Sequence, residues 1–257
     1  MPQPALADPP AEAAAGASAG KAAAPGARAD RRSAILLAAE RLFAQHGYHS
    51  VTIRQIADEA GVPLALVGYY FGPKHDLFHA VFAHWNTTIE QRLAALDAAL
   101  ADAHGPHRIQ RIVEAFVRPV LRMRASAEGQ YYARLVGREL GYSSQEADRV
   151  LREFFDPMAA RFIDALQAAL PGATPADAAW GYQFALGAML HHLVDTRVER
   201  LSGGQARAFD PAASDQLVRF IVGGLRAAWP ARARAARRVA AATHLTTPTP
   251  TPTRRHR

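Results

Sequence analysis

The chain has 257 residues, of which 49% are hydrophobic, and it carries a formal net charge of +7 and no cysteine. The absence of cysteine excludes disulfide bonds, thiolate metal sites and cysteine nucleophiles. No apolar run reaches the ~18 residues of a membrane-spanning helix without a charged residue, so we expect no membrane partner. The net charge does not by itself indicate a nucleic-acid partner, because residues 230–257 hold seven arginines and no acidic residue and so account for all of it.

The two ends of the chain are expected to be disordered. Residues 1–30 are mainly alanine, proline, glycine and short polar residues, which cannot bury enough apolar surface to offset the loss of chain entropy on folding. Asp8 and Glu12 interrupt the apolar positions of this arm, which argues against a secretory signal. Residues 230–257 predict a basic disordered tail, which either adds non-specific DNA affinity or only improves solubility.

Residues 31–76 predict a three-helix domain whose last two helices form a helix-turn-helix. The first helix is amphipathic and ends at Gly47. Thr52 and Gln55 have the spacing of a capping box, in which each side chain bonds to the backbone N–H of the other residue. Gly61 can supply the left-handed residue that ends this helix, and Pro63 suits the start of the next one. A helical hairpin inside a larger bundle would give the same local signals.

The sequence around this motif resembles the DNA-binding domain of the tetracycline-repressor (TetR) family. Members characteristically carry A-x-x-L-F-x-x-x-G-Y/F-x-x-x-T-x-x-x-I-A-x-x-A-G-V, followed by Y-x-F-x-x-K-x-x-L. The matching residues of this chain are Ala39, Leu42, Phe43, Gly47, Tyr48, Thr52, Ile56, Ala57, Ala60, Gly61, Val62, Tyr69, Phe71, Lys74 and Leu77. The resemblance covers about residues 31–80 and implies a bacterial, cytoplasmic transcriptional regulator that binds double-stranded DNA.

The second helix of the motif departs from the family pattern. Many members carry a tyrosine, a threonine and a polar residue where this chain has Gly68, Leu66 and Leu64. The outward arc of Ala65, Gly68 and Tyr69 is therefore poor in hydrogen-bond donors. Base contacts from this helix would rest on Tyr69 and on apolar contacts with thymine methyl groups.

Arg54 is consequently the main candidate for reading bases. It projects from the first turn of the preceding helix, at a position where the family's prototype places an arginine on guanine; the alternative is a solvated surface arginine. Phosphate contacts, which position a protein without selecting a sequence, are expected from Thr52, Gln55, Tyr69 and Lys74. Tyr70 is assigned either to the interface or to the core. The whole predicted interface comprises Thr52, Arg54, Gln55, Leu64, Ala65, Gly68, Tyr69, Tyr70 and Lys74.

Helical periodicity continues after the motif as far as residue 229, with no convincing strand pattern. The expected helices span about Lys74–Ala103, Pro106–Ala127, Gln130–Leu140, Ser144–Leu170, Pro175–Arg200 and Pro211–Trp229. Pro119 should bend the second of these helices, and Pro157 should interrupt the fourth. The predicted fold is all-α, with three helices for the DNA-binding domain and six for an effector-binding and dimerisation domain at residues 77–229.

The resemblance also implies an effector pocket in this second domain. Each aromatic residue there can equally be ordinary core. The predicted pocket residues are Phe116, Tyr131, Arg134, Phe155, Phe162, Trp180, Phe184 and His191. Residues 130–200 further resemble the effector domain of fatty-acid-responsive members. An acyl or aromatic carboxylate is therefore our hypothesis for the small-molecule effector, with Arg134 or His191 at the pocket mouth.

Small residues on the last two long helices predict the interface of a homodimer, because they permit close approach of helices. The predicted interface residues are Ala178, Gly181, Ala185, Gly187 and Ala188 on one helix and Phe220, Ile221, Gly223, Gly224 and Leu225 on the other. A single helix-turn-helix reads few base pairs, so such proteins pair about a twofold axis on inverted half-sites. The predicted function is a ligand-responsive repressor that binds a palindromic operator as a homodimer.

Other interpretations have less support in the sequence. An architectural DNA-binding protein without an effector would have a well-filled core. An enzyme is disfavoured because the chain has no phosphate-binding glycine loop, no zinc-binding pattern and no nucleophile elbow in a suitable context, so we expect neither catalytic residues nor a cofactor. His191 and His192 lie near Asp195 in sequence, but adjacent residues point about 100° apart on a helix. We therefore expect a polar patch at these residues and no metal site.

Overall fold

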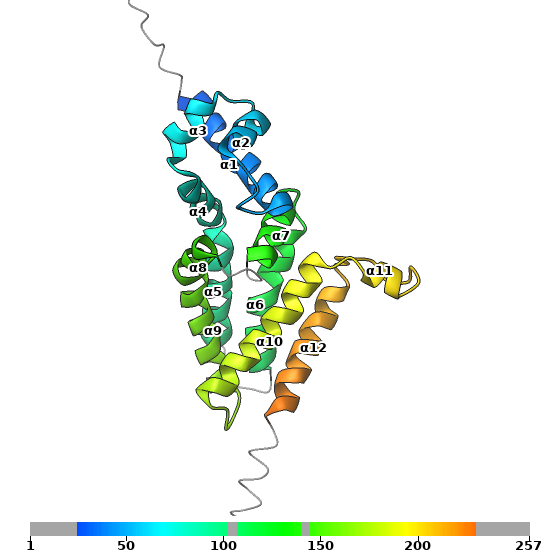
Figure 1. Ribbon diagram of the computed structural model, residues 1–257. Helices are drawn as coiled ribbons and strands as arrows, with labels where there is room; N and C mark the ends of the chain where they lie inside the picture. The colour runs from blue at the N-terminus through cyan, green and yellow to red at the C-terminus, as the bar shows by residue number, and fades with distance from the viewer. Residues whose placement is uncertain (1–24, 102–106, 140–143, 230–257) are drawn as a thin grey trace, which may run out of the picture.

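Helices make up the regular structure of this protein in the computed structural model, which describes residues 25–101, 107–139 and 144–229 (Figure 1). The described residues contain no strand. The elements are α1 (Pro25–His46), α2 (Ile53–Ala60), α3 (Leu64–Phe71), α4 (Lys74–His84), α5 (Asn86–Ala101), α6 (Arg108–Arg124), α7 (Gly129–Glu139), α8 (Gln145–Val150), the π-helix η1 (Leu151–Phe155), α9 (Asp156–Ala169), α10 (Pro175–Val194), α11 (Val198–Leu201) and α12 (Ala213–Ala228). The all-α prediction is confirmed. The tail predicted at residues 230–257 lies outside the described residues.

Helices α1 to α3 form the head of the molecule, at one end of the chain's long axis (Figure 1). The predicted capping box begins α2: Gln55 N–H donates to the Thr52 hydroxyl at 3.2 Å, and Thr52 N–H donates to Gln55 Oε1 at 2.8 Å. Gly61 ends α2 in the left-handed region, with φ 64°. The side chains of Ile56 and Val67 are fully buried, so α2 and α3 meet around a tight turn as the sequence predicted.

Helix α1 begins at Pro25, so residues 25–30 of the arm predicted at 1–30 are helical, while residues 1–24 lie outside the described part. Arg28 Nη2 donates to the Tyr69 hydroxyl at 2.6 Å, and the Arg32 guanidinium lies 4.9 Å from the ring centroid of Phe71. These contacts with α3 stabilise the first turns of α1. Composition alone could not reveal them, because they join residues far apart in the sequence.

The single helix predicted over about Lys74–Ala103 is divided into α4 and α5 at Trp85, whose backbone has φ −93° and ψ 7°. The indole Nε1 of Trp85 donates to Glu40 Oε2 at 2.8 Å, and its ring stacks on Tyr132 with centroids 5.2 Å apart. Tertiary contacts with two other helices thus hold the side chain at the break. The helical periodicity of the sequence contains no sign of them.

Helix α10 ends at Val194, before the Arg200 predicted from the sequence. The Asp195 carboxylate accepts hydrogen bonds from the backbone N–H of Arg197 at 2.6 Å and from its Nε at 2.7 Å. Such local side-chain bonds compete with continuation of a helix. The chain then forms the separate short helix α11, which projects from the body of the molecule (Figure 1).

The two prolines expected to disturb helices differ in effect. Pro119 lies inside α6, which continues through it to Arg124. Pro157 lies in the first turn of α9, directly after η1, where the N–H of Asp156 bonds to the C=O of Leu151 five residues earlier. This wide turn accommodates a residue that cannot donate the next helical bond. The predicted interruption near Pro157 is therefore confirmed.

Two hydrophobic cores hold the helices together. The first core, here called the core of the head, joins the head to α4 and α7. Its members include Phe78, Phe82, Tyr132 and Leu135. The second core lies among α5, α6, α9, α10 and α12. Because α4 and α7 contribute to the core of the head, side-chain packing crosses the domain boundary predicted at residues 76/77. The boundary itself stays a prediction.

The start of α7 lies very close to the end of α6. Gly129 is buried there, and a Cβ at this position would lie 2.1 Å from the carbonyl oxygen of Met123. A backbone atom cannot move aside as a flexible side chain can, so glycine is required where α7 begins.

Replacing Gly129 by alanine should destabilise the protein by roughly 1–3 kcal/mol, because the backbone must shift to admit the new methyl group. Chemical denaturation measures the difference from wild type. Gly187→Ala on α10 is the matched control, since no atom lies within 4 Å of its added Cβ. The control should be neutral or gain up to about 1 kcal/mol from helix propensity. Equal stability of the two variants would contradict the close approach of α6 and α7.

Candidate DNA interface and effector cavity

The outward face of α3 is exposed and has few polar groups. Leu64 and Tyr69 expose 45% and 65% of their surface, and Ala65 and Gly68 are also exposed. These residues form the arc predicted from the sequence, and the Tyr69 hydroxyl is its polar group. Their contact with DNA stays a prediction.

Arg28 of α1 supplies a cation beside this face. Its Nη2 donates to the Tyr69 hydroxyl at 2.6 Å, and its guanidinium lies 5.4 Å and 5.9 Å from the ring centroids of Tyr69 and Tyr70. Sequence reasoning missed this residue because it fell within the arm predicted at 1–30. The available signal was the basic cluster of Arg28, Arg31 and Arg32 directly before an amphipathic helix.

The predicted interface residues of α2 are all exposed. Thr52 and Gln55 hold each other in the capping box, where Gln55 Oε1 accepts hydrogen bonds from Thr52. The amide nitrogen of Gln55 remains available to a phosphate. Arg54 projects into solvent beside them, an orientation that permits the predicted base contact, which stays a prediction.

Lys74 and Tyr70, the remaining predicted interface residues, are half-buried. Lys74 Nζ lies 4.3 Å from the ring centroid of Tyr48, and burial lowers the pKa of this lysine. Tyr70 packs edge-on against Tyr69 with centroids 5.2 Å apart. Both assignments of Tyr70, to the core and to the interface, are therefore compatible with its position.

A cavity of about 330 Å³, here called the central cavity, lies among α5, α6, α7, η1, α9 and α10. Met123 of α6, Leu151 and Phe155 of η1 and Met189 of α10 contribute to its largely apolar wall. Its size falls near the lower end of the ~300–1,000 Å³ typical of small-molecule sites.

Among the predicted pocket residues, Phe155 lines the central cavity. Phe116 and Phe162 are core residues beside it, with 3% and 1% of their surface exposed. Trp180 and Phe184 lie on the outer surface of α10 and expose 60% and 63%, which corrects their predicted placement. Helix α10 is apolar on more than one face, so its periodicity could not distinguish the side that faces the cavity from the side that faces outward.

The other predicted pocket residues also lie elsewhere. Tyr131 packs against the core of the head. Arg134 is exposed, and neither it nor Tyr131 is part of the cavity wall. His191 is exposed as well and pairs with Asp195, with 3.1 Å between Nε2 and Oδ2. The cation expected at the pocket mouth therefore comes from neither Arg134 nor His191.

Arg92 of α5 is the basic residue of the central cavity. It exposes 4% of its surface, and its guanidinium lies 4.3 Å from the ring centroid of Phe116 and 5.7 Å from that of Phe162. Its Nε and Nη2 atoms have no hydrogen-bond partner among the described residues. Burial lowers the pKa of Arg92 to about 10, so the side chain is positively charged at neutral pH. Sequence reasoning missed it; the available signal was its place on the inward stripe of Thr88, Arg92 and Leu96.

Glu40, Trp85 and Tyr132, here called the joint, connect the head with the central cavity. Glu40 of α1 exposes only 1% of its surface and accepts the Trp85 hydrogen bond at 2.8 Å. Trp85 stacks on Tyr132 at an interplanar angle of 16°, and Tyr132 is part of the cavity wall. Burial raises the pKa of Glu40 to about 7, opposed by the hydrogen bond from Trp85 and reinforced by nearby Glu128.

Comparison with known families covers both parts of the molecule. Residues 35–81 match the family described as bacterial regulatory proteins, tetR family, and residues 114–224 match the tetracyclin repressor-like C-terminal domain. The chain belongs to the TetR family. The family resemblance predicted from the head is therefore confirmed, and it extends to the helices around the central cavity.

Relatives of this TetR-family chain match it over part of their length. It is 40% identical over 84 residues to the HTH-type transcriptional regulator BetI of Brucella suis, which covers 32% of this chain and 41% of that protein. It is 41% identical over 64 residues to the HTH-type transcriptional regulator HbdR of Aromatoleum sp., which covers 25% of this chain and 28% of that protein. The chain thus spans less than half the length of these relatives.

Solved structures of similar fold cover more of the chain. The fatty acid degradation regulator FadR of Bacillus halodurans gives a TM-score of 0.53 at 17% identity, over 80% of this chain and 99% of that one. The hemolysin II transcriptional regulator HlyIIR gives a TM-score of 0.54 at 18% identity, over 77% of this chain and 98% of that one. At these identities the likeness concerns the fold alone.

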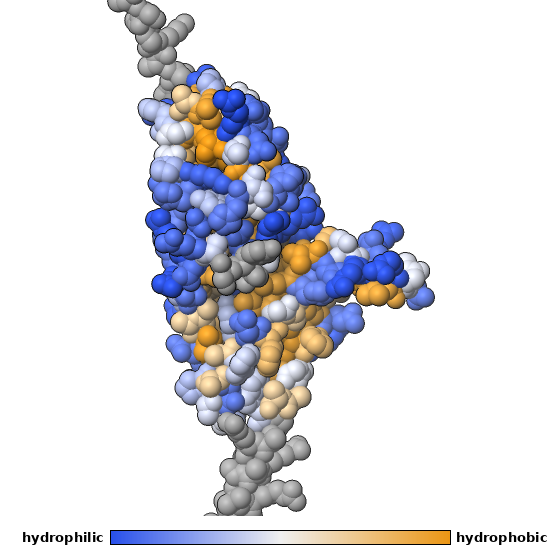
Figure 2. Space-filling view, in the orientation of Figure 1, coloured by the Kyte–Doolittle hydropathy of each residue, from blue (hydrophilic) through white to orange (hydrophobic). Residues whose placement is uncertain are grey.

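An apolar face extends over α10 and α12 of this TetR-family chain (Figure 2). Trp180, Phe184 and Phe220 expose 60%, 63% and 71% of their surface there. A Cβ built on Gly223 or Gly224 of α12 would meet no atom within 4 Å from other elements of the described part of the chain. Large side chains and open glycines thus alternate on one accessible surface.

Part of the predicted dimer interface instead joins α10 to α12 within one chain. A Cβ on Gly181 would lie 2.9 Å from Leu225 and 3.0 Å from Trp229, so this glycine serves the contact between the two helices. Ala178, Ala185 and Ile221 are buried in the second core for the same reason. The small-residue pattern could not separate contacts within the chain from contacts between chains.

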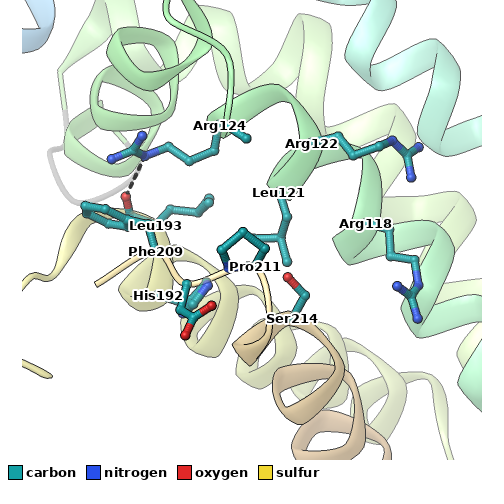
Figure 3. Close-up of a pocket in the computed structure, with 11 residues that line it drawn as sticks. Arg118, Leu121, Arg122, Arg124, His192, Leu193, Phe209, Pro211 and Ser214 are labelled. Carbon is teal, nitrogen blue, oxygen red and sulfur yellow. Dashed lines mark hydrogen bonds between the residues drawn. The ribbon is translucent and has the colours of Figure 1, made fainter. Parts of the chain in front are cut away.

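A second hollow of about 300 Å³, the lateral hollow, lies between α6, the end of α10 and the segment before α12 (Figure 3). Arg124 Nε donates to the Leu193 carbonyl oxygen at 3.3 Å, and its guanidinium lies 4.0 Å from the ring centroid of Phe209. Arg118 pairs with Asp215 at 2.9 Å. These two arginines bond to protein acceptors, whereas Nε and Nη2 of Arg92 have no acceptor among the described residues.

The polar patch predicted around His191 and His192 is formed by their own helix and the turn after it. His192 is half-buried at the lateral hollow, and burial lowers its pKa. The described residues contain no group of three His, Asp or Glu side chains arranged to hold a metal ion. In the same ranges, no helix combines the length and apolar character that crossing a membrane requires.

The joint predicts a pH-dependent stability. The pKa of Glu40 rises from 4.5 to about 7 in the folded protein, so the stabilisation by its neutral carboxyl is fully present below pH 4.5 and is lost as the pH rises through about 7. Glu40→Gln keeps the shape and cannot ionise. At pH 8 the variant should therefore be more stable than wild type, with a free energy of unfolding roughly 1–3 kcal/mol larger, because no buried carboxylate forms.

Urea denaturation of both proteins at pH 5 and pH 8 measures this difference, which should shrink at the lower pH. Glu59→Gln is the matched control, since Glu59 pairs with Arg41 on the exposed surface at 3.1 Å. A difference between Glu40→Gln and wild type that is the same at both pH values would contradict the raised pKa of Glu40.

Proposed function

We propose that this TetR-family chain is a DNA-binding transcriptional repressor, and that a small-molecule effector in the central cavity controls its affinity for double-stranded DNA. One observation carries the proposal: Met123, Tyr132 and Phe155 belong to the cavity wall and also pack with the core of the head. A ligand that displaces these side chains changes the position of the head. The match of residues 35–81 to bacterial regulatory proteins supports the regulatory role.

The central cavity favours this proposal over an architectural DNA-binding protein without an effector. Protein interiors are close-packed, and an internal void forfeits contacts that would stabilise the fold. A protein that only bends or bridges DNA has no use for an opening of about 330 Å³. A regulator that must respond to a metabolite does.

We infer that the apolar face of α10 and α12 pairs with the same face of a second copy. Trp180, Phe184 and Phe220 are largely exposed in the single chain, and a large apolar side chain gains roughly 1.5–3 kcal/mol on full burial. Twofold pairing of this face forms a four-helix bundle. It also presents two heads to inverted half-sites about 34–36 Å apart, or a multiple of that distance, as a palindromic operator requires.

The effector acts by differential affinity for two arrangements of the paired heads. A tenfold change in DNA affinity needs a coupling free energy of only about 1.4 kcal/mol. Rearrangement of the joint, with its buried hydrogen bond between Trp85 and Glu40, is sufficient to supply an energy of this size.

Gel-shift titration with the DNA upstream of the chain's own gene tests the proposal. Arg54→Ala should weaken binding by about 1–3 kcal/mol, or roughly five- to 150-fold, because a guanine loses its bidentate partner. Arg54→Lys distinguishes base reading from phosphate contact, since lysine keeps the charge and loses the planar fork. Arg152→Ala, on the surface of η1 and paired with Asp148, is the control. Wild-type affinity of the Arg54→Ala protein would rule out its role.

The mass of the protein in solution tests the pairing. Light scattering at micromolar concentration should give twice the mass of one chain for wild type. The double variant Phe184→Glu with Phe220→Glu should give the mass of one chain, because carboxylates would be buried without partners. Ala98→Glu on the exposed surface of α5 is the control and should remain paired. A single-chain mass for wild type would overturn the dimer.

A further inference from the structure

The buried guanidinium of Arg92 is only partly accommodated by the protein. The rings of Phe116 and Phe162 lie 4.3 Å and 5.7 Å from it and provide cation–π contacts. The N–H groups point outward in the guanidinium plane and require acceptors near that plane. Nε and Nη2 are buried without such an acceptor among the described residues, so two donor groups of this cation are left unpaired beside a largely apolar cavity.

We propose that the central cavity binds an apolar monocarboxylate whose carboxylate group pairs with Arg92. This inference rests on the proposed function and specifies the chemical class of its effector. A carboxylate offers two oxygens in the fork geometry of a guanidinium and neutralises its charge. The same group satisfies the buried N–H donors, which a neutral ligand would leave with weaker bonds.

The rest of the cavity wall suits a ligand with one charge and an apolar body. Tyr132 and Tyr182 also line the cavity, and burial raises the pKa of both hydroxyl groups, so these groups stay neutral and can act as hydrogen-bond donors. Asp156 is the acidic residue of the wall. A wall that holds one arginine and one aspartate disfavours a doubly charged group such as a phosphate monoester, while the methionine, leucine and phenylalanine side chains accept an alkyl or aryl chain.

The lateral hollow is a poorer candidate for the same ligand. Its Arg124 already bonds to the Leu193 carbonyl oxygen and stacks on Phe209, and Arg118 pairs with Asp215. Arg122 is exposed to solvent, where water weakens an ion pair. Figure 3 shows these three arginines extending from α6.

Binding at Arg92 would act directly on the joint. Tyr132 contributes to the wall that holds Arg92 and stacks on Trp85, and Trp85 bonds to Glu40 of α1. A carboxylate drawn toward the guanidinium therefore presses its chain against residues that position the head. The charge of the effector fixes its orientation, and its chain displaces the cavity wall.

Isothermal titration calorimetry on the full chain at neutral pH tests the inference. The probes are n-octanoate, n-decanoate, n-dodecanoate and 4-phenylbutyrate, each compared with its primary amide, and decyl phosphate. At least one carboxylate should bind with a Kd at least tenfold lower than that of its amide and than that of decyl phosphate. Failure of every carboxylate to exceed its amide would overturn the inference, as would tightest binding of decyl phosphate.

Variants locate the site. Arg92→Leu, which replaces the charge with an apolar side chain, should abolish the preference for carboxylate over amide while the amide still binds. Arg122→Leu at the lateral hollow should keep the preference. The opposite pattern would overturn the assignment to Arg92. The comparison on the unmodified protein needs no variant, so misfolding of the Arg92→Leu protein would not decide the outcome.

The two proposals fail in distinguishable ways. A protein that binds its upstream DNA as a dimer but shows no preference for carboxylates overturns the Arg92 inference alone. A protein that binds carboxylates through Arg92 but does not bind that DNA overturns the regulatory function, and the ligand site stands.

Discussion

The stacking of Trp85 on Tyr132 is the contact that joins the first residue after α4 to the wall of the central cavity. Trp85 lies at the break between α4 and α5, and Tyr132 belongs to both the core of the head and the wall of the central cavity. The indole also donates to Glu40, which is buried in α1. A rigid aromatic pair with a buried hydrogen bond at one end cannot deform gradually, because interiors are close-packed. In the proposed regulation, displacement on the cavity side is therefore passed to α1 as movement of the whole head.

Helix α7 is packed against both parts of the molecule and would carry the proposed movement. Its buried face carries Tyr132 and Leu135 into the core of the head, and its start is fixed against α6 by the close approach at Gly129. Near its other end, Arg138 Nη2 donates to the carbonyl oxygen of His46 at the end of α1 at 3.2 Å. Helix α7 is thus attached to both parts, and a shift of α6 or η1 around a ligand reaches the head through it. Two stable arrangements of one attached helix are sufficient for a population shift.

The sequence determines locally encoded features well and tertiary features poorly. The capping box of Thr52 and the left-handed Gly61 depend on residues a few positions apart, and both occur as predicted. The break at Trp85 depends on partners in α1 and α7, so helical periodicity could not reveal it. Trp180 lies on an outer face that is as apolar as an inner one, and only packing distinguishes them. Arg92 escaped notice because charged residues are usually exposed.

The buried guanidinium of Arg92 and the buried carboxyl of Glu40 make the fold less stable than an apolar core of the same shape would be. Unpaired buried charges cost free energy that hydrophobic replacements recover, and Arg92 lacks an acceptor at Nε and Nη2 just as Glu40 lacks a donor at Oε1 among the described residues. A purely structural core would favour neutral side chains at both positions. Arg92 lies at the cavity and Glu40 at the far side of the joint, so in the proposed regulation an anion that pairs with Arg92 would offset the cost of its burial beside the wall to which Tyr132 belongs.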